Sequence, residues 1–70
     1  MKAHERFDKW AKSQYLTNVA IAQSLEKMTG LKIKHQHVRY WRTAGSPRSY
    51  LWEPIEKLTK GKIKAATWAK

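Results

Sequence analysis

The spacing of the apolar residues is the feature that most restricts the fold of this chain, because they recur every three or four positions in several separate blocks. In the segment 4–14, Phe7, Trp10 and Ala11 stand at i, i+3 and i+4, with charged residues between them. A helix with one apolar face has this pattern. We therefore predict a first helix over 4–14.

The segment 15–30, "YLTNVAIAQSLEKMTG", predicts a second helix. Thr17 or Asn18 is the expected N-cap, and Gly30 is the expected stop, since these residue types favour the two ends of a helix. The predicted apolar face holds Ile21, Ala22, Leu25 and Met28.

A third helix is predicted over 35–43, ending at Ala44 and Gly45. At about 100° per residue, Val38 and Trp41 fall on one side, so we expect them to be buried. We expect His37 to lie beside Val38 and to pack between helices. The opposite arc is polar, and it comprises Gln36, Arg39, Tyr40 and Thr43, with His35 and Arg42 near its edges.

The last third of the chain predicts a fourth helix in "YLWEPIEKLTKG", with Leu51, Ile55 and Leu58 on one face. Pro54 lies inside this segment, so either a short turn precedes it or the helix begins there. Upstream, Ser46 and Pro47 have the residue types of an N-cap and a first helical position. The tail 60–70 is predicted to be a short strand, a last helical turn or a flexible or dimerising segment.

No segment alternates long enough to demand a sheet, and the 70 residues fit one domain, 1–70. The predicted fold class is all-α, a small four-to-five-helix bundle. Without cysteine the chain has no disulfide and no thiolate zinc ligand, so its stability must come from packing, to which four Trp residues contribute. The sequence shows no signal peptide and no membrane-length apolar run, and we expect a cytoplasmic protein.

The net positive charge of the chain indicates what kind of partner it binds. The chain has 15 Lys and Arg against 5 Asp and Glu, a formal charge of +10. No acid occurs between Lys32 and Leu51, although that segment holds five basic residues. A basic region of this kind in a small folded domain favours nucleic acid, since binding a polyanion releases counterions. Because the third helix joins an apolar seam to an arc of hydrogen-bonding side chains, it resembles a helix that reads base edges in a major groove.

Metal binding and catalysis have little support in the sequence. His35 and His37 are two positions apart, so on a helix they point to different sides and do not converge on one ion. The chain has no glycine-rich phosphate loop, nucleophile elbow or clustered carboxylates. We expect no enzyme activity, no metal, no cofactor and no small-molecule substrate.

Two stretches resemble the Cro-like phage repressors and YdaS-type regulators, a helix-turn-helix family. In "IAQSLEKMTGLKIKHQHVRYW" the family's positions are filled by Ala22, Leu25, Gly30, Ile33, Val38 and Trp41. In "SPRSYLWEPIEKLTKGKIKAATW" they are filled by Pro47, Pro54, Ile55, Glu56, Thr59, Gly61, Ile63 and Trp68. The family's usual spacing is shorter on both sides of the glycine, which predicts a helix-turn-helix with a lengthened helix 2 and turn.

The resemblance implies a double-stranded DNA operator as partner, bound as a homodimer that represses transcription. It implies base contacts from His35, Gln36, Arg39 and Tyr40, and a phosphate contact at Asn18. Charge and position add Lys34, Arg42, Thr43 and Arg48 as phosphate contacts. Trp52, Trp68 and the tail are candidates for the dimer surface, unless both Trp residues complete the core.

Two other functions stay open. One is a regulatory interaction protein, for example an antitoxin-like or inhibitor-associated module, whose main partner is another, acidic protein and whose DNA binding serves autoregulation. The chain could also bind DNA or RNA without sequence preference, using Trp and Tyr for stacking. Because Trp10 and Trp41 fall on apolar helical faces, we expect them in the core, which favours duplex DNA.

Overall fold

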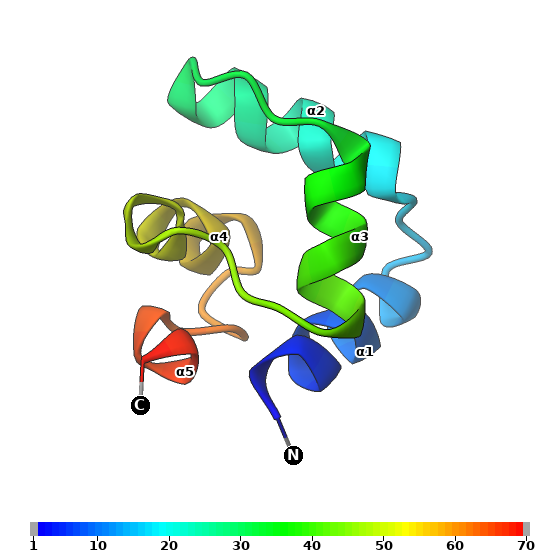
Figure 1. The fold of residues 1–70 in the computed structure, drawn as a ribbon, viewed down its shortest axis with the longest axis vertical. Coiled ribbons are helices and arrows are strands. Elements are labelled where there is room, and N and C mark those ends of the chain that lie inside the picture. Colours follow the sequence, from blue (N-terminus) through cyan, green and yellow to red (C-terminus); the bar gives the residue numbers. More distant parts are fainter. Residues whose placement is uncertain (1, 70) are drawn as a thin grey trace.

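The computed structural model describes residues 2–69 and is all-helical over that range. Five helices and one short 3-10 turn follow each other along the chain (Figure 1). They are α1 (Ala3–Ser13), α2 (Asn18–Thr29), α3 (His35–Thr43), η1 (Ser49–Leu51), α4 (Trp52–Leu58) and α5 (Ala65–Trp68). The predicted fold class is confirmed, and the first three predicted helices agree with the observed bounds to within a residue or so.

The ends of α2 form as the sequence predicts. The Thr17 hydroxyl oxygen accepts a hydrogen bond from the backbone N–H of Ala20 at 3.1 Å, so Thr17, not Asn18, is the N-cap. Gly30 ends the helix with φ of 72°, a left-handed conformation that glycine adopts without steric cost. The connection over 30–34 then leads into α3, which gives the predicted helix-turn-helix with a long second helix and turn.

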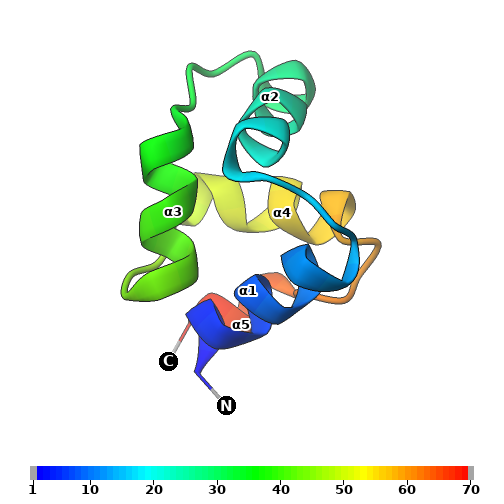
Figure 2. The ribbon, with the colours of Figure 1, turned by 90° about the vertical axis from the view of Figure 1, so that its right-hand side faces the viewer.

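Helix α3 packs against α1 and α2, and α4 packs against α2 and α5. Figure 2 shows α3 at the left side of the molecule, α1, α2 and α4 to its right, and the loop between α4 and α5 at the right-hand edge. One side of α3 is therefore covered and the other is open to solvent.

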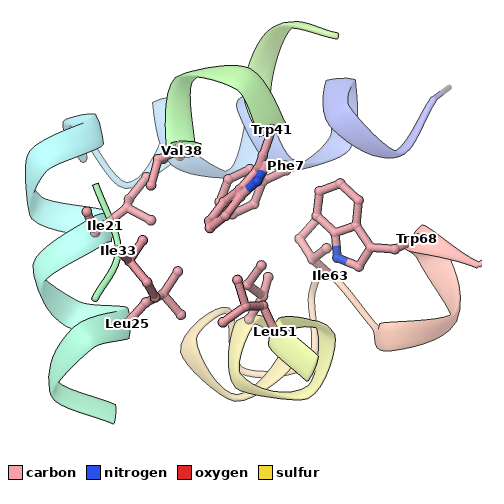
Figure 3. Packing of buried hydrophobic residues seen from close by; sticks show 12 residues of the cluster. Phe7, Ile21, Leu25, Ile33, Val38, Trp41, Leu51, Ile63 and Trp68 are labelled. Carbon is pink, nitrogen blue, oxygen red and sulfur yellow. The ribbon is translucent and has the colours of Figure 1, made fainter. Parts of the chain in front are cut away.

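The core lies where these helices meet (Figure 3), and every helix supplies at least one buried side chain. Its members are Phe7, Ala11, Ile21, Ala22, Leu25, Ile33, Val38, Trp41, Leu51, Ile55, Ile63 and Trp68. Met28 was predicted to join the face of Ile21 and Leu25, but it is 45% exposed. The prediction was wrong because Met28 lies in the last turn of α2, beyond the helices that cover the two earlier residues.

The segment 46–48 does not start a helix, so the prediction of Ser46 and Pro47 as N-cap and first position was wrong. Pro47 is instead buried, and its carbonyl accepts a hydrogen bond from the indole N–H of Trp52 at 3.0 Å. The helical turns start with η1, and α4 starts at Trp52. Pro54 therefore stands in the first turn of α4, where a missing N–H breaks no helical hydrogen bond.

The tail forms a last helical turn, the second of its three predicted alternatives. Two side chains, those of Thr59 and Glu56, hold the turn over 59–65 that precedes it. Thr59 Oγ1 accepts from the N–H of Ile63 at 3.0 Å, and Glu56 Oε1 accepts from the N–H of Ala65 at 2.8 Å. Ile63 and Trp68 are thereby placed in the core, while residue 70 lies outside the described residues.

Candidate nucleic-acid interface

Helix α3 is fixed to the rest of the protein by two buried side chains, Val38 and Trp41, as predicted. At its C-terminal end the backbone N–H groups of Ala44 and Gly45 both donate to the carbonyl of Tyr40, at 3.0 and 2.9 Å. The chain then leaves the helix directly. The open side of α3 is therefore short, about two and a half turns, and ends sharply at Ala44.

The open side of α3 carries only polar and aromatic side chains, and all of them are exposed. We call this set the polar face, and it consists of His35, Gln36, His37, Arg39, Tyr40 and Thr43. The four predicted base-contacting residues all belong to it. None of its members is acidic, so no side chain of the face itself repels a phosphate backbone.

His37 and Arg42 exchange the positions that the sequence predicted for them. His37 was expected to pack between helices beside Val38, and this was wrong, because the side chain is exposed. Arg42, expected near the edge of the polar arc, is instead mostly buried, with a side chain only 14% exposed. The cause is the placement of α1 and the start of α2, which cover the edge of α3 that carries Arg42.

Arg42 ties three helices together. Its Nε donates to Asp8 Oδ1 in α1 at 2.7 Å, and its Nη1 donates to Asn18 Oδ1 in α2 at 2.8 Å. Asp8 also pairs with Lys12 one helical turn away, at 3.1 Å. Burial alone raises the pKa of Asp8, but the hydrogen bonds and positive charges of Arg42 and Lys12 outweigh it and bring the pKa below its ordinary value of 3.8. Arg42 therefore fixes the position of α3 against α1 and α2.

Replacing Asp8 tests this arrangement. Asp8→Asn is expected to lower the free energy of unfolding by about 1–2 kcal/mol, because it leaves the mostly buried guanidinium without a counter-charge. In a domain of this size that corresponds to a melting temperature lower by roughly 4–8 °C per kcal/mol. Lys12→Met is the matched control: Lys12 is 72% exposed, so its loss should change stability by less than about 0.5 kcal/mol. Thermal unfolding of the three proteins measures both effects.

The same pair predicts a pH dependence. Because the pKa of Asp8 is lowered in the folded state, its carboxylate stabilises the fold fully above its ordinary pKa, and this contribution is lost as the pH falls. The gap between the unmodified chain and Asp8→Asn should be constant above about pH 5 and should narrow below about pH 4. Urea unfolding across this range measures it, and a gap that is independent of pH would contradict the role of the charge.

The predicted phosphate-contacting residues differ in how far the structure leaves them available. Lys34 and Arg48 are exposed. Asn18 is half-buried at the start of α2, and its Oδ1 is used by Arg42, which leaves its amide N–H₂ as the donor. Thr43 Oγ1 donates to the carbonyl of Arg39 at 2.9 Å, so in this rotamer its hydroxyl hydrogen is not directed outwards.

Tyr40 and Gly45 form the best-defined contact on the polar face. A Cβ built on Gly45 would overlap three ring carbons of Tyr40, so the ring lies directly over this glycine. Tyr40 is nevertheless 57% exposed. Gly45 thus has a local steric role, since the absence of a Cβ leaves room for the Tyr40 ring at the C-terminal end of α3.

We expect Gly45→Ala to displace the Tyr40 ring while changing stability by less than about 1 kcal/mol, because an exposed ring can turn away. The measurement is the ring proton shifts of Tyr40, together with affinity for duplex DNA. In a Tyr40→Ala background the same glycine substitution should have no further effect on affinity, which a double-mutant cycle reveals. An equal loss in both backgrounds would show that Gly45 acts on binding independently of Tyr40.

The structure adds residues of α2 that the sequence did not single out. A shallow groove of about 420 Å³ runs between α2 and the start of α3, and it brings Gln23 and Glu26 beside Lys34, His35 and Gln36. Gln23 is exposed and can donate or accept next to the polar face. Glu26 places one carboxylate at the edge of a region that has no acid in its own sequence. Only the tertiary packing of α2 on α3 reveals this proximity.

Metal ligands do not gather in the part of the chain that the structure describes: no three His, Cys, Asp or Glu side chains converge there. The same residues include no helix that combines the length and the apolar character needed to cross a bilayer.

Comparison with known proteins does not assign the chain to a family. No protein-family model matches the chain, and no curated protein or solved structure shows significant similarity to it. The resemblance to Cro-like and YdaS-type regulators therefore remains a prediction from the sequence.

Proposed function

We propose that this protein is a sequence-specific double-stranded DNA-binding repressor that inserts α3 into the major groove. The observation that carries the proposal is the polar face: six exposed hydrogen-bonding side chains without an acid, on a helix whose other side is fixed by Val38 and Trp41. An α-helix with its side chains is about 10–12 Å across, and the major groove is about 12 Å wide. The groove therefore admits a helix presented in this way.

The proposed contacts divide into two kinds. His35, Gln36, Arg39 and Tyr40 would meet base edges, with Arg39 suited to guanine and Gln36 to adenine. Exposed Lys34 and Arg48, together with the amide of Asn18, would hold phosphates and set the register. Arg42 is left out of this interface because its guanidinium is bonded to Asp8 and Asn18. His37 is added as a further donor at the edge of the face.

A single helix of nine residues reads only a few base pairs, so we propose a homodimer on a palindromic operator. Of the two tryptophans considered for its surface, Trp68 is in the core and Trp52 is partly buried and bonded to Pro47. Trp68 therefore belongs to the core, while the exposed part of Trp52 and the exposed residues of the tail stay candidates for the dimer surface.

Duplex DNA is favoured over single strands because two aromatic side chains that could stack with bases are occupied. Trp41 is buried, and Trp10 packs on Phe7 with ring centroids 5.9 Å apart. A repressor of this kind occupies its operator and excludes polymerase, which needs no catalytic group. Localisation with the nucleoid in the cytoplasm of a bacterial host follows from this proposal.

The test is the affinity of the full chain for the DNA upstream of its own gene against random duplex, measured at several salt concentrations. We expect at least a thousandfold preference for one upstream site, the usual lower bound for specific recognition. Equal affinity for both duplexes would overturn the proposal and favour a non-specific binder.

A further inference from the structure

A second concave surface borders the polar face. It lies on the flank of α3 opposite Arg42, between this flank, the turn that follows α2 and the segment that leads into η1. Its volume is about 350 Å³. We call it the flank groove. Its floor is made by the buried side chains Ile33, Trp41 and Leu51, so it opens directly onto the core.

Exposed apolar side chains gather along the flank groove. Among the described residues six large hydrophobic side chains are exposed, and three of them, Leu31, Tyr40 and Tyr50, line this groove at 43–60% exposure. Exposed apolar side chains that gather around a concave site mark a binding surface more often than scattered ones do.

The charged groups at the rim are basic. Lys32 and Arg48 carry positive charges there, and His37 adds an imidazole. No acidic residue lines the groove. The complementary ligand therefore has an apolar group for the floor and negative charges on both sides of it.

Duplex DNA does not meet this description. Its outer surface offers phosphates to Lys32 and Arg48, but its bases are stacked inside, and the small C–H groups of its sugars do not project as an anchor that fills a concave site floored by Ile33 and Leu51. A peptide with an aliphatic or aromatic anchor between Asp and Glu residues provides both parts of the complement. The apolar floor thus separates the two candidate ligands.

We propose that the flank groove binds an acidic peptide segment of a partner protein, with a hydrophobic anchor side chain seated on Ile33, Trp41 and Leu51. Tyr40 and His37 belong both to this groove and to the polar face of α3. A bound segment therefore occupies side chains that face the DNA, and its binding excludes the duplex. The exclusion rests on the proposed function, whereas the peptide site stands on the groove alone.

The probe is a short fluorescein-labelled peptide with a central Leu–Trp pair flanked by Asp and Glu. Binding to the full chain is followed by fluorescence polarisation and by amide NMR shifts. We expect shifts that centre on Leu31, Tyr40 and Tyr50. Affinity should be at least about tenfold higher than for the same acidic peptide with Ala–Ala at its centre, because only the anchor buries apolar area. Equal affinity for both peptides, or shifts centred elsewhere, would overturn the proposal.

Two variants assign the site. Tyr50→Ala and Leu31→Ser should each weaken the peptide about fivefold while leaving duplex affinity within about twofold, since neither residue is a proposed DNA contact. Tyr15→Ala is the matched control, because Tyr15 is the most exposed large hydrophobic among the described residues and does not line the groove. Unchanged peptide affinity in both variants would contradict the site, and circular dichroism confirms that each variant folds.

Further arms separate this proposal from the DNA proposal. Arg39→Ala should weaken the duplex and leave the peptide unaffected. Addition of the peptide should release a labelled duplex, and a ternary complex would overturn the mutual exclusion. If the chain shows no duplex preference but still binds the peptide through the groove, the peptide site holds and the repressor does not. Tighter binding of oligothymidine than of the peptide at these residues would assign the groove to an unpaired nucleotide instead.

Discussion

Trp68→Ala is expected to lower the free energy of unfolding by about 3–5 kcal/mol, as large-to-small changes at buried aromatic positions do. The side chain is 6% exposed, and its ring meets Phe7 edge-on with centroids 5.7 Å apart (Figure 3). Its loss removes the contact through which α5 closes the core. At roughly 4–8 °C per kcal/mol, the melting temperature should fall by more than about 12 °C. Urea unfolding followed by circular dichroism gives the free energy directly.

Trp68→Phe provides an informative comparison. The indole Nε1 of Trp68 is buried and has no hydrogen-bond acceptor among the described residues. A buried donor without a partner is unfavourable, so phenylalanine removes a destabilising group while it keeps an aromatic ring against Phe7. We expect a net loss of about 1 kcal/mol or less. A loss as large as that of the alanine variant would contradict this expectation, since the whole indole would then be needed to fill the core.

The exposed tyrosine at position 15 sets the baseline. Tyr15→Ala should change stability by less than about 0.5 kcal/mol, because almost all of this side chain is in solvent. If Trp68→Ala melts as close to the unmodified chain as Tyr15→Ala does, then α5 is not part of the cooperative core. In that case Trp68 would again be a candidate for the dimer surface.

The fold of the first half follows from signals that are local in the sequence. Thr17 and Gly30 bound α2 because their side chain and backbone freedom satisfy its two ends, and both can be identified without tertiary information. The apolar spacing of Val38 and Trp41 likewise fixes which side of α3 is buried. In such places local preference and tertiary packing agree.

The edges of α3 show where local signals end. At about 100° per residue, His37 and Arg42 lie equally far, about 70°, from the midline between Val38 and Trp41. The helix alone cannot say which edge is covered. The covered edge is the one that carries Arg42, because Asp8 of α1 and Asn18 of α2 accept hydrogen bonds from it. His37, on the other edge, has no such partner from α1 or α2 and stays exposed. For this reason the sequence predicted Arg42 at the surface, whereas in the structure it links three helices.

The second half of the chain was harder to predict, because the same residue types there are compatible with more than one local structure. Ser46 and Pro47 have the residue types of a helix start, yet the carbonyl of Pro47 is needed by Trp52, and the segment stays extended. The flank groove could not be predicted at all, because Leu31, His37 and Tyr50 come from three separate segments. Long-range packing alone brings them together.

Arg39→Ala is expected to lower affinity for the operator by about 1–3 kcal/mol and to relax the preference at one base pair. Arg39 is exposed in the middle of the polar face, and its guanidinium can donate two hydrogen bonds to guanine in the major groove. Random duplex should lose much less, because it offers this side chain only phosphate. The ratio of the two affinities is therefore the quantity to measure, at fixed salt.

Two charge-matched variants separate base reading from charge. Arg48→Ala removes an exposed cation next to the polar face, so it should weaken operator and random duplex alike and lower the salt dependence by about one counterion. Lys62→Ala removes a cation beside Arg6 and Lys9, in the loop between α4 and α5 that Figure 2 shows on the opposite side of the molecule from α3, and it should change neither affinity by more than about twofold. An affinity ratio that Arg39→Ala leaves unchanged would mean that α3 does not read the sequence, since its central donor would then act only as a positive charge.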